Sequence, residues 1–175
     1  DKLKERQNNA QQAQSYLQNP TGGSTRGGSA TLQSSWDFPS EYASKLKSYP
    51  SAATVTQSLS GNSYPVGQCT WYVYNRLVDA GSPAYNWLGN GQDWVRNLVA
   101  KGWKFSNTPV AGAVVSVAGG FGYTLPAYGH VAYVEYVNPD GSFLISECNV
   151  SGVQNKIHWA VWTNQTYYTF AIPPK

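Results

Sequence analysis

The stretch YPVGQCTW, residues 64–71, marks where the chain takes on the patterning of a folded domain. Apolar residues follow it at helical spacing until Gly81 and Pro83, which predicts a helix over residues 69–80. Cys69 then lies in the first turn of this helix. Backbone N–H groups without helical partners, together with the helix dipole, favour a thiolate over a thiol at such a position. The stretch therefore indicates a nucleophilic cysteine.

The chain beyond this helix alternates between helical and strand-like patterns. A second helix is predicted over residues 91–101, where Gly102 ends it. Apolar or alternating runs bounded by turn residues predict strands over residues 110–117, 130–137, 142–149 and 167–172, and the turn NPDG (138–141) joins the second strand to the third. We expect an α+β fold, with N-terminal helices packed on a central antiparallel β-sheet.

Composition divides the chain into four segments. Residues 1–19 contain no Gly or Pro until the following Pro20, and their apolar positions predict a helical tail of coiled-coil type. Residues 20–35 have the composition of a Gly/Ser-rich linker, residues 36–63 predict a partly helical lead-in, and residues 64–175 form the α+β domain. Because the chain starts at Asp1 and contains no Met, we expect further sequence upstream.

Composition also narrows the class of partner. A net charge of +3 without a basic cluster argues against a nucleic-acid partner. No stretch approaches the roughly 18 to 20 apolar residues needed to span a bilayer, so no membrane span is expected in this chain. Charged residues make up only 12% while aromatic residues reach 14%, which suits a secreted protein that handles neutral polar polymers, because flat rings stack on sugars and peptides.

A histidine in the motif YGHVA, residues 128–132, is the expected base. The chain has two His. Gly129 is expected to let a substrate or the nucleophile's helix approach the start of the predicted strand, and a neutral imidazole at His130 can take the proton of Cys69. We expect the other histidine, His158, to be a structural residue on a surface strand or loop.

The motif SECN, residues 146–149, supplies expected partners for the base. Strand alternation places Glu147 and Asn149 on one face, where either can accept from His130 and stabilise its imidazolium. Glu147 is the first choice and Asn149 the second, and a solvated strand face without a role is the alternative. Gln68 is expected to help the backbone amides of the helix start bind an oxyanion.

Taken together, YPVGQCTW, YGHVA and SECN resemble the motifs of the CHAP family of cysteine- and histidine-dependent amidohydrolases and peptidases, within the papain-like NlpC/P60 superfamily. The likeness covers roughly residues 64–173. It implies a papain-like fold, with Cys69 as nucleophile, His130 as general base and acid, and Glu147 and Asn149 as the groups that orient His130. It also implies peptidoglycan as substrate, cut at the amide joining the glycan to the stem peptide or at a peptide bond of the stem or cross-bridge.

Several further expectations concern the surroundings of the nucleophile. A disulfide between Cys69 and Cys148 is an alternative, which the alternation disfavours because Cys148 then faces away from Glu147. Trp87 and Tyr128, in Gly-rich surroundings, are expected to line a substrate groove. We expect no metal and no other cofactor, since residues 43–68 contain no Asp or Glu.

The sequence thus supports two classes of function. The first is a secreted, cell-wall-associated peptidoglycan hydrolase working through a thioester acyl-enzyme. The alternative is a wall-binding or scaffold module whose catalytic groups are occluded. In either case the N-terminal helix is expected to mediate self-association or contact with a protein partner.

Overall fold

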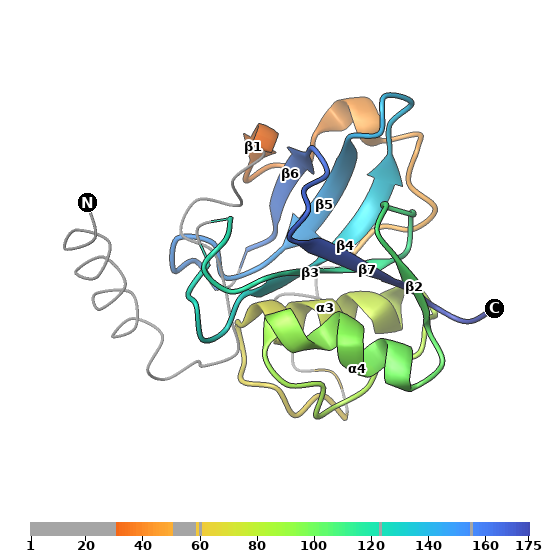
Figure 1. Cartoon of the computed structure of the whole chain (residues 1–175). Helices are drawn as coiled ribbons and strands as arrows, with labels where there is room; N and C mark the ends of the chain where they lie inside the picture. Colours follow the sequence, from red (N-terminus) through yellow and green to blue (C-terminus); the bar gives the residue numbers. More distant parts are fainter. Residues whose placement is uncertain (1–30, 51–58, 60, 123, 155) are drawn as a thin grey trace.

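Seven antiparallel strands form one sheet in the computed structural model, which describes residues 31–50, 59, 61–122, 124–154 and 156–175. Two α-helices lie beside each other on one side of this sheet (Figure 1). The predicted α+β fold class is therefore confirmed. The strands are β1 (Thr31–Ser35), β2 (Lys104–Ser106), β3 (Val114–Val117), β4 (His130–Val137), β5 (Phe143–Glu147), β6 (His158–Trp162) and β7 (Tyr168–Ile172), and the helices are α3 (Cys69–Asp79), α4 (Trp94–Ala100) and the 3-10 turns η1 (Ser40–Tyr42) and η2 (Gly91–Asp93).

The sheet order is β1-β6-β5-β4-β3-β7-β2, so the strands at the centre are not the first in sequence. The predicted turn between β4 and β5 is present: the Gly141 N–H donates to the Asn138 carbonyl at 2.9 Å, and Gly141 has a φ of 90°. Helix α3 packs against β4, and α4 packs against β3 and β7. These contacts fix the helices relative to the strands that border the site described below.

Apolar side chains fill both faces of the sheet. One cluster lies between the sheet and the helices and contains Trp71, Trp94 and Val114. A second cluster, with Val115, Ile145 and others, covers the opposite face. Strands buried on both faces have continuous apolar runs instead of alternating ones, and this is why β6, whose five residues are all buried, was absent from the predicted strands.

The described residues correct several predicted boundaries. The helix predicted over residues 69–80 is confirmed as α3, whereas residues 91–101 begin as a 3-10 turn and become α-helical only from Trp94. Residues 110–113 do not join β3, because a turn with Gly112 at a φ of 90° precedes that strand. Strand β5 ends at Glu147, two residues earlier than predicted.

The segments upstream of α3 are only partly as predicted. The linker expected over residues 20–35 is wrong for its last five residues, which form β1 and pair with β6. The polar sequence of these five residues did not predict a strand, because β1 is an edge strand with mostly exposed side chains. Among the described residues of the lead-in, helical structure is confined to one turn, η1, whose Tyr42 packs against the apolar cluster of Trp159. The predicted tail, residues 1–19, and the rest of the linker lie outside the described residues.

No helix among the described residues combines the length and the apolar character needed to cross a membrane.

A buried ion pair joins α3 to the sheet. Both Nη2 and Nε of Arg76 donate to the Glu135 carboxylate, at 2.8 and 2.9 Å. The Ser146 hydroxyl donates to the same carboxylate at 2.6 Å, and the Tyr72 hydroxyl donates to Ser146 at 2.7 Å. Arg76 also donates to the Ser48 carbonyl at 3.0 Å, which ties the lead-in to the helix. These hydrogen bonds offset much of the cost of burying the two charges inside the domain.

We expect Arg76→Met to destabilise the domain by about 3 to 5 kcal/mol, because it leaves the Glu135 carboxylate buried and unpaired. Urea denaturation measures the free energy of unfolding. The matched control is Arg96→Met, whose 3.2 Å pair with Asp93 is largely exposed and should contribute less than about 1 kcal/mol. Equal losses in the two variants would contradict a structural role for the buried pair.

Candidate active site

The expected nucleophile occupies the position that the sequence indicated. Cys69 is the first residue of α3, and the preceding Gln68 is extended, with φ of −78° and ψ of 163°. Gly67 turns the chain into the helix with a φ of 87°. The Cys69 side chain is 0% exposed and lies where the positive end of the helix dipole favours a thiolate.

The expected base and its acidic partner are in direct contact. His130 begins β4 and Glu147 ends β5, so the two neighbouring strands deliver them to the same end of the sheet. The Nε2–H of His130 donates to Oε1 of Glu147 at 2.6 Å, and both residues are buried. A charge-assisted bond of this length fixes the orientation of the imidazole ring.

The other ring nitrogen of His130 is left for the cysteine. Within the described part of the chain, Nδ1 of His130 is buried and makes no hydrogen bond of regular geometry. Burial alone lowers the pKa of His130, but the neighbouring Cys69 and Glu147 outweigh it and raise the pKa from 6.5 to about 10. The site therefore favours the imidazolium form of His130.

A second histidine completes the surroundings of Glu147. The Nδ1–H of His158 donates to Oε2 of Glu147 at 2.8 Å. Burial raises the pKa of Glu147, whereas the hydrogen bonds and charges of His130 and His158 lower it, and the net shift is downward. The carboxylate is thus held ionised in a site from which water is excluded.

The expectation that His158 lies on a surface strand or loop is wrong. His158 is 3% exposed and begins β6, which lies between β1 and β5 inside the sheet. The sequence signal that could have placed it is the unbroken run HWAVW, residues 158–162, since such runs are typical of strands covered on both faces.

Asn149 and Gln68 are buried near the site, but their roles stay predictions. Asn149 lies beyond the end of β5 with a φ of 65°, so strand alternation does not place it on the face of Glu147. Its N–H donates to the Val153 carbonyl at 3.1 Å, in the loop after β5. Gln68 is fully buried and directly precedes the nucleophile, where its carbonyl accepts from the Tyr72 N–H at 3.1 Å.

The two residues expected in a substrate groove have different settings. Trp87 is 86% exposed with a φ of 65°, and the following Leu88 is anchored where its N–H donates to the Tyr64 hydroxyl at 3.1 Å. Tyr128 is half-buried and lies two residues before His130. Their part in substrate binding stays a prediction.

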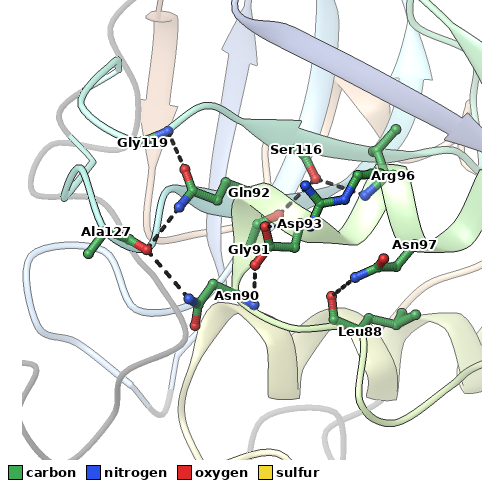
Figure 2. A network of polar contacts seen from close by, with 11 residues as sticks. Leu88, Asn90, Gly91, Gln92, Asp93, Arg96, Asn97, Ser116, Gly119 and Ala127 are labelled. Atoms are coloured by element: carbon green, nitrogen blue, oxygen red, sulfur yellow. Dashed lines mark hydrogen bonds and ion pairs between the residues drawn. The ribbon is translucent and has the colours of Figure 1, made fainter.

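Gln92 fastens the segment that leads into His130, as Figure 2 shows. Its side chain donates to the Ala127 carbonyl at 2.8 Å and accepts from the Gly119 N–H at 2.9 Å. Its backbone N–H donates to the Tyr128 carbonyl at 3.0 Å. One residue thus holds both ends of residues 119–128. Gln92 was not among the expected site residues, because an isolated Gln has no sequence pattern that indicates such a role.

Two glycines allow η2 to pack directly on the start of β4. A Cβ at Gly91 would lie 2.5 Å from the His130 carbonyl carbon. The Ser116 hydroxyl donates to the Gly91 carbonyl at 2.8 Å (Figure 2). Gly129 has a φ of 60°, and a Cβ there would collide with the Val117 carbonyl and Gln92. The nearest neighbours of Gly129 are therefore β3 and η2 rather than the nucleophile's helix, and an approach by substrate at this residue stays a prediction.

The two cysteine side chains are not bonded to each other. Cys69 and Cys148 are both free, so the disulfide alternative is wrong. Burial, with the charges of Glu147 and Cys69, raises the pKa of Cys148 and keeps it a thiol.

Within the described ranges, no group of three or more His, Cys, Asp or Glu side chains is arranged to hold a metal ion.

Comparison with known proteins adds a family to this geometry. The CHAP domain profile matches residues 59–149, more than half of the chain, and these residues include Cys69, His130 and Glu147. This chain belongs to the CHAP family. The match ends before β6, so His158 lies outside the part that defines the family.

Relatives of this CHAP chain include staphylococcal proteins. A probable autolysin, SsaALP of Staphylococcus aureus, is 46% identical over 88 residues, which cover 50% of this chain and 31% of the relative. An N-acetylmuramoyl-L-alanine amidase domain-containing protein of the same species is 48% identical over 91 residues, covering 51% of this chain and 14% of the relative. The crystal structure of an N-acetylmuramoyl-L-alanine amidase from S. aureus has a TM-score of 0.62 and 31% identity, covering 79% of this chain and 37% of that one. The matched part of the chain thus spans about a third or less of the length of these two curated relatives.

Gln92→Ala should loosen residues 119–128 without unfolding the domain. Each lost hydrogen bond is worth about 1 kcal/mol, so the amide of Gly119 should exchange with deuterium roughly fivefold faster. Hydrogen exchange followed by NMR measures this rate. Gln33→Ala is the matched control, because the Gln33 side-chain amide donates to the exposed Glu41, far along the chain from residues 119–128. An unchanged rate at Gly119 would contradict the fastening role.

Proposed function

We propose that this chain is a peptidoglycan hydrolase that cleaves an amide bond through Cys69 and His130. The observation that carries the proposal is the buried 2.6 Å pair of His130 and Glu147 beside Cys69, at the first turn of α3 in a CHAP chain. The raised pKa of His130 supports a thiolate–imidazolium pair. Such a pair is the reactive state of thiol hydrolases.

The proposed reaction has two steps. The Cys69 thiolate attacks the amide carbonyl, and the C–N bond breaks as His130 gives its proton to the departing amine, which leaves a thioester. His130, now neutral, takes a proton from water, whose oxygen attacks the thioester carbonyl. The C–S bond breaks, a carboxylic acid is released, and the Cys69 thiolate is restored beside the His130 imidazolium. Backbone N–H groups at the start of α3, with the side chain of Gln68, stabilise the oxyanion in both steps.

Among amide bonds of peptidoglycan, we favour the one that joins the lactyl group of the glycan to the stem peptide. The support is the name N-acetylmuramoyl-L-alanine amidase, which describes cleavage of this bond and is carried by one relative of known structure and by a Staphylococcus epidermidis relative. The second option is a peptide bond of the stem or cross-bridge. The related autolysin and staphylococcal secretory antigens support a secreted protein associated with the cell wall.

The complete burial of Cys69 favours a second candidate, an occluded wall-binding module. A substrate carbonyl reaches a sulfur of 0% exposure only if a neighbouring segment gives way. Gln154 from the loop after β5 packs over Gly67, where a Cβ would lie 2.6 Å from the Gln154 Cβ. In this second candidate the thiol stays covered, and the chain binds peptidoglycan without cutting it.

Cys69→Ala should abolish the release of fragments from purified peptidoglycan, whereas Cys148→Ala should retain most of it, because Cys148 is a buried thiol outside the proposed reaction. Mass spectrometry of the digest identifies the bond. Free stem peptides with intact glycan indicate an amidase, and new amino termini in peptides still attached to glycan indicate an endopeptidase. No fragment that depends on Cys69, from several wall types, would favour the occluded module.

The pH dependence of cleavage should report the charge on His130. The imidazolium is present below its raised pKa, so kcat/KM should fall as the pH rises through about 10. The stability contributed by this pairing is complete below pH 6.5 and is lost between pH 6.5 and about 10. Glu147→Gln removes a charge that raises the pKa of His130, so its alkaline limb should move down by about one pH unit or more.

The matched control for this profile is Glu41→Gln, which changes a carboxylate on the exposed side of η1. Its profile should coincide with that of the unchanged protein. If the alkaline limb of the Glu147→Gln profile lies at the same pH as that of the unchanged protein, Glu147 does not act on the charge of His130.

A further inference from the structure

We propose that His158 is a positioning residue of this site, holding the Glu147 carboxylate that in turn holds His130. This inference rests on the proposed function and adds a residue from outside the family match, which ends at residue 149. His158 does not touch the reacting atoms in this scheme. It acts by fixing the place and the charge of Glu147.

Sheet register dictates the contact between these residues. Glu147 and His158 are directly opposite each other where β5 pairs with β6. Opposite residues on neighbouring antiparallel strands point to the same face with their side chains close together. The two histidines therefore reach the carboxylate from different strands, His130 at 2.6 Å on Oε1 and His158 at 2.8 Å on Oε2.

Burial makes both hydrogen bonds necessary. Glu147 is 0% exposed, and a carboxylate without donors in such a site takes up a proton instead of staying charged. With His158 present, each carboxylate oxygen has a ring N–H donor. Without it, Oε2 loses the ring N–H of His158, the pKa of Glu147 rises, and the negative charge that supports the His130 imidazolium is weakened.

Strand β1 fixes His158 from its outer side. Nε2 of His158 lies 2.8 Å from the Ser34 hydroxyl, and the ring of Trp36 meets the imidazole edge-on, with centroids 4.8 Å apart. The Ser34 hydroxyl can donate to Nε2, which leaves the ring proton on Nδ1, where Glu147 accepts it. Ser34 also lies outside the family match, on its N-terminal side. Residues from both flanks thus support the central pair.

The alternative is that His158 only fills space and stabilises the sheet. A structural role changes the free energy of unfolding but leaves the protonation of Cys69 and His130 as it was. A positioning role changes the pH dependence of the thiolate. Substitutions that keep or remove the Nδ1 donor separate the two, because an Asn side chain can present an N–H near the place of Nδ1 and a Phe side chain cannot.

The experiment compares His158→Phe, His158→Asn and Ser34→Ala with the unchanged protein. The thiolate of Cys69 is titrated by absorbance at about 240 nm, subtracting in each case the same protein with Cys69→Ala, and kcat and KM are measured on purified peptidoglycan. Gln33→Ala, on the same strand as Ser34 but bonded to exposed Glu41, is the matched control and should not move either readout.

We expect His158→Phe to lower kcat about tenfold or more with little change in KM, and to narrow the pH range of the thiolate–imidazolium pair by about one unit. His158→Asn should recover most of this loss, and Ser34→Ala should shift the titration in the same direction as Phe by a smaller amount. A titration that stays unchanged in folded His158→Phe, or equal losses in Asn and Phe, overturns the proposal. If His158→Phe does not fold, a titration that stays unchanged in Ser34→Ala overturns the proposal.

The two readouts keep this inference separate from the proposed function. The thiolate titration needs no peptidoglycan. A titration that responds to His158 while the unchanged protein releases no fragments would refute the hydrolase proposal but support the positioning role. Fragment release that depends on Cys69, together with a titration that does not respond to His158, would support the hydrolase proposal but refute the positioning role.

Discussion

The ionised carboxylate of Glu147, enclosed between two imidazole rings, is the constraint on which the rest of the site depends. A charge without solvent is stable only if donors surround it, and the donors here come from the strands on both sides of β5. The order of β4, β5 and β6 therefore determines which donors reach the Glu147 carboxylate. Sheet geometry, rather than a flexible loop, determines where His130 meets Cys69.

Individual residues hold the start of β4 and helix α3 in place. Gly91 and Gly129 remove the side chains that would separate η2 from the first residue of β4. Gln92 then ties the preceding segment at both ends. On the same side of the sheet, Arg76 and Glu135 join α3, the helix of the proposed nucleophile, to the strand that carries His130. The proposed nucleophile and the proposed base are thus both fastened to β4, which limits their relative movement.

Sequence patterning predicted the parts of this domain that have local signals. The helix at Cys69 has a turn before it and apolar spacing within it, and the hairpin after β4 has a strong turn motif, so both could be placed. Strand β1 is polar because it is an edge, and β6 is uniformly apolar because both its faces are covered; neither shows the alternation that marks a half-buried strand. His158 was misplaced for the same reason. Its partnership with Glu147 depends on strand register, which a single sequence does not contain.

The place of β7 in the sheet has a consequence for how the chain acquires its structure. The last strand in the sequence lies between β3 and β2, and β2 pairs only with β7 among the strands described. While the chain is being synthesised, β3 therefore keeps an unpaired edge, and β2 has no neighbouring strand among those described, until residues 168–172 emerge. Contacts between such distant segments must overcome a large loop-closure entropy, which makes folding slow. Completion of the sheet is a late event in time, and the unfinished edge is the surface through which a nascent chain is most exposed to aggregation.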